Sequence, residues 1–421
     1  MNTFNVTSFG AAADGQTNDT LAIQAAIDEA GRSGGVVLVP AGIYRIGTIV
    51  LRSGIRLHLD AGAVLVGSID IADYRDDIGC FIDGVGQKRG ISLIYAEEAE
   101  RISITGEGTI DGQGEYFRKD RGYTGVRPFL VRFVRCHGIE MQGVTLKDSA
   151  AWVSHYHECS EVDITGVTIR SRVNSNNDGI DIDSCSHVRI HDCDIDTGDD
   201  AIVLKSTTVA SCEYIAIRHC KLRSNWAGIK FGTESLGGFR HVTVADCYIY
   251  DTNGCGIKLL TVDGAPLEHV ELSDITMEQV SGPIFLRLGS RLRTYMEGQQ
   301  SKSAGVLRNI VFRNIKANVK ELPDRKSAVC ISGIPGHPVE NIVFDNVDIT
   351  FPGGTTEEID YHAIPELETA YPEYYMFGTA PAYGMFLRHV KGITLKQVTL
   401  KTMQPDLRPE MVLVDVTGMQ Q

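Results

Sequence analysis

The sequence predicts an all-β protein folded as a parallel β-helix, and three observations support this. A phrase of alternating apolar and polar residues recurs, as in EVDITGVTI at 161–169, HVRIHDCDI at 187–195 and HVTVADCYI at 241–249. From residue 138 onward its copies begin 23, 26, 27, 27, 28, 40, 32 and 51 residues apart. Helical periodicity is almost absent after the first 31 residues. Short repeats of this kind cannot bury their apolar faces alone, so they must stack as a solenoid.

Other repeat folds fit this pattern less well. A leucine-rich repeat would need a leucine-rich frame, and a propeller would need a period of about 40 residues or more. No change in composition marks a second domain. We therefore expect one β-helix domain over residues 1–421, with an N-terminal cap and first strands in about 1–60. Residues 351–385 are predicted to form an inserted loop that could cover a cleft.

The N-terminal elements can be predicted in order. Val6–Ala11 is expected to be a strand that runs to a turn at Asp14-Gly15. A helix is expected to follow, with Asn18-Asp19-Thr20 as its cap and with Gly31 and Gly34-Gly35 at its end. Its apolar face consists of Ile23, Ala26, Ile27 and Ala30. This helix would cover the open edge of the first strands, which are predicted at 36–39, 44–46, 49–51 and 55–59.

Composition limits the partners. The chain has 421 residues, 43% of them hydrophobic, and a formal net charge of -14. This charge argues against a nucleic acid or an anionic membrane as the main partner, although an acidic substrate could still bind a local basic pocket. No apolar run reaches the roughly 20 residues of a membrane span. Because no secretory signal is visible, we expect a cytoplasmic protein, or a secreted one if a leader was removed.

The ten cysteines follow the repeat. Cys193, Cys220 and Cys247 are 27 residues apart, which indicates stacked, buried thiols in successive coils and not a disulfide scaffold. No Cys or His cluster has the spacing of a zinc site, so no metal is expected.

Two acidic turns lead into similar strands. When 176–183 and 198–205 are aligned, Asp178 lies over Asp200 and Ile180 over Ile202. Ile229 and Ile257 take the same place 27 and 28 residues further on, so the four isoleucines should stack inside the helix. Neighbouring strands lie about 4.8 Å apart, which would bring two or three carboxylates together. A single Asp would be explained by turn chemistry, but crowded carboxylates raise one another's pKa and suit acid–base catalysis.

These residues carry a resemblance to a known family. Asn176-x-Asp178, followed by Gly198-Asp199-Asp200, resembles glycoside hydrolase family 28, which contains the polygalacturonases and rhamnogalacturonan hydrolases. Further similar phrases span nearly the whole chain: Phe9-Gly10-Ala11, GEGTIDGQG at 106–114, Asp148-Ser149 with Trp152, and Pro335-Gly336-His337-Pro338. The resemblance implies a right-handed parallel β-helix and hydrolysis with inversion, without a metal or other cofactor. It also implies that Asp199 is the general acid and that Asp178 and Asp200 activate the water.

The sequence departs from the polygalacturonase pattern one coil later. Asn225-Trp226-Ala227-Gly228 stands where those enzymes carry Gly-His-Gly, and only Lys258 remains of their Arg-x-Lys. The Asn-Trp-x-Gly phrase is more similar to the rhamnogalacturonan-acting branch. We therefore expect a pectic oligo- or polysaccharide substrate that contains galacturonic acid, of the rhamnogalacturonan type and attacked from the chain end.

Several residues are candidates for binding this substrate. Lys230 and Lys258 lie on the same strand face as Asp181 and would bind a uronic acid carboxylate, unless they form a salt-bridged outer ladder. Trp226 could stack on a sugar ring and Glu234 could bind hydroxyls, unless they are packing and turn residues. The remaining candidates, each with a core or solvated alternative, are His155, Arg287 and Arg291.

Two other functions compete with hydrolysis. A polysaccharide lyase would need calcium-binding acids and an Arg or Lys base, and it would release an unsaturated product that absorbs ultraviolet light. A non-catalytic carbohydrate-binding β-helix would bind pectic fragments without cleaving them. The acidic triad and the uneven insertions favour the hydrolase.

Overall fold

The computed structural model describes residues 2–79, 81, 82, 86, 88–320 and 327–421. Its internal contacts divide the chain into two compact units, Met1–Asp199 and Asp200–Gln421. Each unit is a right-handed parallel β-helix whose strands form three rows of parallel neighbours, as the repeat period predicts.

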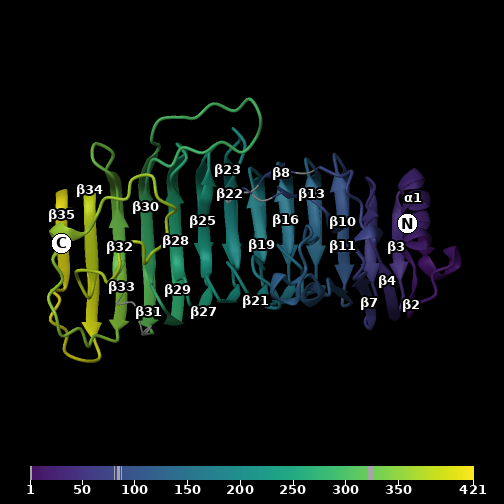
Figure 1. Cartoon of the computed structure of the whole chain (residues 1–421), viewed down its shortest axis with the longest axis horizontal. Coiled ribbons are helices and arrows are strands. Elements are labelled where there is room, and N and C mark those ends of the chain that lie inside the picture. Colours follow the sequence, from purple (N-terminus) through teal and green to yellow (C-terminus); the bar gives the residue numbers. More distant parts are fainter. Residues whose placement is uncertain (1, 80, 83–85, 87, 321–326) are drawn as a thin grey trace. The chain divides into compact units, whose positions relative to one another are not determined.

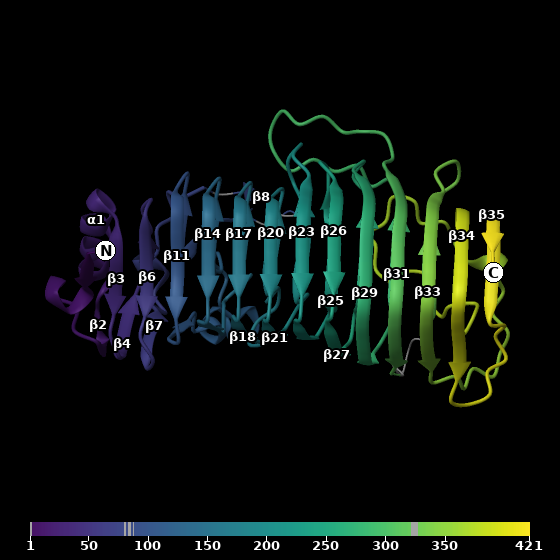
Figure 2. The same cartoon turned by 180° about the vertical axis from the view of Figure 1, so that it is seen from behind.

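Unit 1 begins the repeat. Its first row comprises β5 (Ile49–Val50), β10 (Ser92–Glu97), β13 (Phe129–Val134), β16 (Ser154–His157) and β19 (Ile180–Asp183). Its second row comprises β1 (Thr3–Asn5), β3 (Gly35–Val39), β6 (Ile55–Leu59), β11 (Glu100–Gly106), β14 (His137–Gln142), β17 (Ser160–Thr165) and β20 (Ser186–His191), of which the last four lie side by side in Figure 2. Its third row comprises β2 (Asp14–Asn18), β4 (Gly42–Ile46), β7 (Ala63–Gly67), β12 (Thr109–Asp111), β15 (Thr145–Lys147), β18 (Thr168–Ser171) and β21 (Asp194–Thr197).

Unit 2 continues the same pattern with longer strands. Its first row comprises β22 (Ile202–Ser206), β25 (Ala227–Ser235), β28 (Cys255–Thr261), β30 (Ile284–Leu288), β32 (Val329–Ser332), the start of β34 (Met385–Thr402) and the start of β35 (Met411–Gln420). The second row comprises β23 (Cys212–Arg218), β26 (Phe239–Ala245), β29 (Pro266–Val280), β31 (Val306–Val319), β33 (Val339–Phe351) and the rest of β34. The third row begins with β24 (Lys221–Ser224) and β27 (Tyr248–Thr252) and continues in the second halves of the long strands.

The predicted N-terminal helix is present as α1 (Thr20–Ser33), which packs against β1, β3, β5 and β6 at the N-terminal end (Figure 1). The predicted face is the buried one, with Ile23, Ala26, Ile27 and Ala30 all inaccessible to solvent. Asn18 accepts a hydrogen bond from the Thr20 backbone N–H at 3.1 Å and so caps the helix. No helix in the described ranges is long and apolar enough to span a bilayer.

Two details of the N-terminal prediction are wrong. Val6–Phe9 forms a 3₁₀ helix (η1) and not a strand, because Asn5 accepts the Thr7 N–H at 3.0 Å and Gly10 ends the turn with φ of 96°. Gly31 lies inside α1 and does not end it. A Cβ at Gly31 would lie 2.8 Å from Cβ of Arg52, so the glycine permits the close approach of the helix to that residue.

The remaining short elements lie in connections. The 3₁₀ turns are η2 (Ile71–Asp73), η3 (Gly114–Phe117), η4 (Lys119–Arg121) and η5 (Tyr361–Ala363). A small antiparallel pair joins β8 (Phe81–Ile82) to β9 (Lys88–Arg89). The predicted insertion is confirmed as a segment without strands, residues 352–384, between β33 and β34. A second one, residues 289–305, separates β30 from β31 and rises above the strand ends in Figure 1.

The interior consists of stacked aliphatic residues. In unit 2, Ile202, Ile229, Ile257 and Ile284 follow one another in register and are buried, as predicted for the first three. In unit 1, Ile180 is buried in β19 and pairs with Ser154. The nine cysteines among the described residues are all buried and free, as expected for repeat thiols; the tenth, Cys80, lies outside the described residues.

The isoleucine stack generates a stability prediction. Ile229→Ala should destabilise the protein by about 2–5 kcal/mol, because it leaves a cavity between two fixed neighbours. Leu21→Ala, at a side chain that is 84% exposed, should change the free energy of unfolding by less than about 0.5 kcal/mol. Urea unfolding of both variants measures this difference. Equal stability of the two would show that Ile229 is not a core residue.

Candidate active site

The first acidic turn precedes β19 in unit 1 and is held by buried hydrogen bonds. The Asn177 side-chain amide donates to the carbonyls of Ser149 at 2.8 Å and Ala151 at 2.9 Å. The Val153 N–H donates to the Asp178 carbonyl at 2.8 Å, and Asp178 is 4% exposed. Asn177 therefore fixes the backbone from which the Asp178 carboxylate projects.

Asp199 ends unit 1 beside this turn. Its backbone N–H donates to the Asn177 carbonyl at 3.3 Å, and its own carbonyl accepts from Thr197 Oγ1 at 2.7 Å. Unlike Asp178, Asp199 is only partly buried. The two predicted acids of unit 1 thus differ in their access to solvent, which is a common way to give two carboxyl groups different roles.

Asp200 opens unit 2 and is almost fully buried. Its Oδ1 accepts the Ala227 N–H at 3.0 Å, and its Oδ2 lies 2.7 Å from Nζ of Lys230. Burial by itself raises the pKa of Asp200, but the nearby Lys230 and Lys258 outweigh it and hold the pKa below its ordinary value. Asp200 is therefore an ionised carboxylate near neutral pH.

The two predicted substrate lysines are buried in ion pairs. Lys230 and Lys258 are paired in register on β25 and β28, as the alignment predicts. Lys258 is inaccessible to solvent, and its Nζ lies 2.5 Å from Oε2 of Glu373 in the insertion 352–384. Burial lowers the pKa of Lys258, but Glu373 and Asp200 raise it above its ordinary value. Neither lysine is solvated, so the salt-bridged alternative describes this structure.

Trp226 and Glu234 also have partners within unit 2. The Trp226 Nε1–H donates to Oε1 of Glu373 at 3.1 Å, and Lys258 lies 5.1 Å from the centre of its ring. Glu234 is 6% exposed and pairs with Lys205 at 3.3 Å. Although burial raises its pKa, Lys205 and Lys230 lower the pKa of Glu234 to about 2. Glu234 is therefore more than a turn residue: it is a fixed anion on the same strand as Lys230.

The two candidate arginines anchor loops. Arg287 is 1% exposed and donates to the carbonyls of Gly333, Glu366 and Leu367. Burial and the neighbouring Arg388 lower its pKa to about 10. Arg291 forms a bidentate pair with Asp263, at 2.9 and 2.6 Å. In this conformation both guanidinium groups are occupied by the protein, which does not favour their predicted role as carboxylate ligands for the substrate.

His155 lies in the interior of unit 1 and not on an open surface. It is 1% exposed, and its ring contacts Phe81, Phe129 and Trp152. Burial, with a contribution from Arg132, lowers the pKa of His155 to about 3, so the imidazole is neutral. The core alternative therefore fits His155 better than substrate binding.

His155, His157 and Asp183 lie close enough together to be considered as metal ligands. However, the Arg132 Nε–H donates to Nδ1 of His155 at 3.3 Å, which places the proton of the neutral ring on Nε2. That nitrogen faces Oδ2 of Asp183 at 3.6 Å. A metal would require its lone pair instead, so this arrangement fits a positioned histidine better than a metal ligand.

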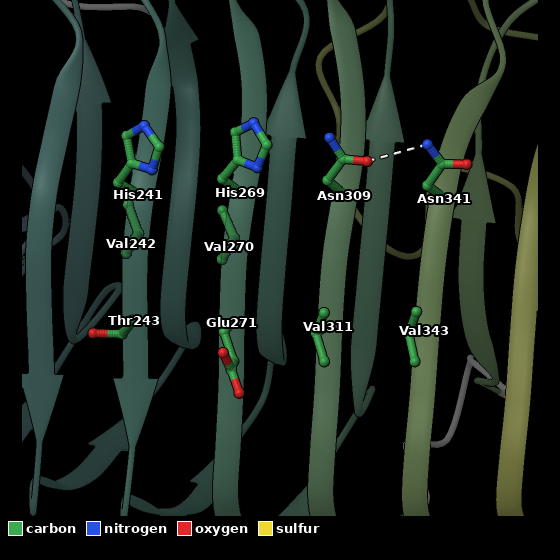
Figure 3. A pocket seen from close by; sticks show the side chains of 10 residues that line it. All are labelled: His241, Val242, Thr243, His269, Val270, Glu271, Asn309, Val311, Asn341 and Val343. Atoms are coloured by element: carbon green, nitrogen blue, oxygen red, sulfur yellow. Dashed lines mark hydrogen bonds between the residues drawn. The ribbon is translucent and has the colours of Figure 1, made fainter.

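A broad surface hollow lies away from these groups, on the second row of unit 2. It has a volume of about 530 Å³ and is lined by β26, β29, β31 and β33. Figure 3 shows its polar margin, where Asn341 donates to Asn309 at 3.1 Å beside His269. Its rows of valines and amides provide no group of acid–base carboxylates, so we do not place the chemistry there.

Sequence reasoning missed Glu373. The available signal was its position in Tyr371-Pro372-Glu373-Tyr374-Tyr375, an aromatic-rich phrase with an acid inside the predicted insertion. Strand register cannot locate such a residue, because Glu373 reaches Lys258 across 115 positions of the sequence.

Comparisons with known proteins agree with this arrangement. The family model described as glycosyl hydrolases family 28 matches residues 37–368, and one described as rhamnogalacturonase A/epimerase, pectate lyase-like, matches residues 3–68. A probable polygalacturonase of Vitis vinifera is 31% identical over 371 residues, which cover 82% of this chain and 74% of the relative. A probable rhamnogalacturonase A of Aspergillus oryzae is 31% identical over 328 residues, which cover 76% and 63% of the respective chains.

A solved structure shows the same fold. The exopolygalacturonase of Thermotoga maritima matches with a TM-score of 0.76 and 24% identity, over 95% of this chain and 92% of the other.

The buried pair of Asp200 and Lys230 generates a pH prediction. Because the folded-state pKa of Asp200 is lowered, its pairing contributes stability above its ordinary pKa of 3.8, and this contribution is lost as the pH falls. Lys230→Met should therefore destabilise the protein by about 3–5 kcal/mol at pH 7 and by less at pH 3. Urea unfolding at both pH values measures this. Lys396→Met, at an exposed lysine, should show no such difference; a pH-independent cost at Lys230 would contradict the assignment.

Proposed function

The chain belongs to the glycosyl hydrolases of family 28, and from this we propose that it is an inverting hydrolase of pectic glycans that contain galacturonic acid. We further propose that it acts from the chain end on substrates of the rhamnogalacturonan type. Relatives named polygalacturonase and rhamnogalacturonase A support the substrate class.

The proposed roles follow the family motif residue by residue. Asp199 protonates the leaving oxygen, and its partial exposure suits a group that must exchange protons with solvent after each turnover. Asp178 and Asp200 are the carboxylates that activate the water. Inversion requires this water to attack from the face opposite the general acid, in a single displacement.

The observation that carries the proposal is the ion pair between Asp200 and Lys230. A base that activates water must be ionised at the working pH, and a buried carboxylate is ionised only with a compensating charge. Lys230 supplies that charge at 2.7 Å. Asp200 thus meets a requirement of the base that a simple turn residue would not need to meet.

Two features support action from the chain end on a rhamnogalacturonan. The Gly-His-Gly of polygalacturonases is replaced by Asn225-Trp226-Ala227-Gly228. Residues of the insertion 352–384 pack against Ala227, Leu260 and Phe285, so the insertion covers part of the first strand row of unit 2. A covered row leaves less room for a long polymer than an open groove does.

The roles of the three acids can be separated with two substrates. Asp199→Asn should lower kcat by about 10²-fold or more on a natural glycan, but by less on an aryl glycoside whose leaving group needs little protonation. Asp178→Asn and Asp200→Asn should be impaired on both substrates. Steady-state rates measure this, and circular dichroism confirms folding. Near-normal turnover of Asp199→Asn on the natural glycan would refute its role as the acid.

The stereochemistry and the products test the reaction itself. Proton NMR of the first turnovers should show a released sugar of inverted anomeric configuration. Chromatography of early time points should show one small product growing from the start. Retention of configuration, an ultraviolet-absorbing unsaturated product, or an early ladder of mixed internal fragments would each contradict part of the proposal.

A further inference from the structure

The insertion 352–384 places a carboxylate of the protein itself where the sequence predicts that a substrate carboxylate would bind. Glu373 lies 2.5 Å from Lys258 and accepts a hydrogen bond from Trp226, both candidates for substrate binding. Lys258 is inaccessible to solvent, whereas the Glu373 side chain keeps 11% of its surface exposed. A ligand that approaches from solvent can therefore reach Glu373 but not the ammonium group behind it.

We propose that Glu373 determines specificity at this position, by neutralising Lys258 so that the sugar unit bound against Glu373 and Trp226 is one without a carboxylate. This inference rests on the proposed function as a pectic hydrolase. It narrows the substrate to glycans that place a neutral sugar, such as a deoxyhexose, beside a galacturonic acid.

The local charges support a neutral ligand. The two lysines Lys230 and Lys258 are already balanced by Asp200 and Glu373. A uronic acid here would add a third anion to a buried site, where weak screening makes repulsion between like charges strong. Sugar hydroxyls, in contrast, can donate to the exposed edge of a carboxylate in charge-assisted hydrogen bonds.

The position of Glu373 is built by the fold. Arg287 donates to the carbonyls of Glu366 and Leu367, and Arg388 donates to those of Ile364 and Pro365. These four carbonyls hold the segment that leads to Glu373. On the other side of Glu373, Tyr375 meets the Trp226 ring edge to face, with ring centres 6.0 Å apart. Contacts on both sides therefore keep the carboxylate at Lys258.

The test compares two kinds of oligosaccharide. In oligogalacturonides every unit is acidic, whereas in rhamnogalacturonan oligosaccharides acidic and neutral units alternate. The wild type should cleave the alternating kind with a kcat/KM at least about tenfold higher. Glu373→Gln should reduce this ratio by about tenfold or more, through a gain on oligogalacturonides, because it frees the charge of Lys258. Glu358→Gln removes the same charge from an exposed site in the same insertion and should leave the ratio unchanged.

A double variant separates the two effects of Glu373. Lys258→Met with Glu373→Leu removes both charges, so it should remain poor on oligogalacturonides. An equal gain in the single and double variants would overturn the proposal. If Glu373→Gln does not fold, trigalacturonates with one methyl ester serve as a second test on the wild type. At least one of the three isomers should be cleaved faster than the free acid, and none doing so would also overturn it.

Failure of the proposed function would look different. A wild type that cleaves neither kind of oligosaccharide would refute pectic hydrolysis. Calorimetric binding of the same two saccharides to the wild type would then decide the inference. Tighter binding of the alternating kind would support it, and equal or weaker binding would overturn it.

Discussion

The compensation of buried lysine charges is the constraint on which the candidate site of unit 2 depends. Three lysines on consecutive strands of the first row, β22, β25 and β28, are at most 4% exposed. An ammonium group buried without a partner would lose its proton or unfold its surroundings. Each lysine instead has a carboxylate: Lys205 with Glu234, Lys230 with Asp200, and Lys258 with Glu373.

This alternation of charges links stability to chemistry. Lys230 and Lys258 are direct neighbours in register, so each lowers the other's affinity for a proton, and the intervening anions must be ionised to offset that repulsion. Asp200 is therefore held as a carboxylate by the same interactions that allow the lysines to be buried. The state required of a catalytic base is a consequence of the strand stack and needs no separate device.

Most of the fold could be predicted because its information is local and periodic. The apolar positions of each phrase, including the isoleucines at 202, 229 and 257, define the stack and its register. The prediction failed where side chains override the pattern, as at Val6–Phe9, where the Asn5 side chain turns the chain. It also failed for the surroundings of Trp226 and Lys258. Those depend on an insertion without periodicity, whose Glu373 meets Trp226 across 147 positions.

The family motif transferred the acids more readily than the cations, and the physical reason lies in how each is positioned. Asp178 and Asp199 are held by backbone hydrogen bonds next to strand ends, which recur in every coil. The arginines and Lys258 are long side chains whose ends are placed by whatever loop lies above them. Apolar groups often replace a buried ion pair at no cost in stability, so stability alone does not explain three such pairs in one row. Their retention is better explained by a site whose charge pattern the substrate must match, with the insertion supplying the part that distinguishes this chain.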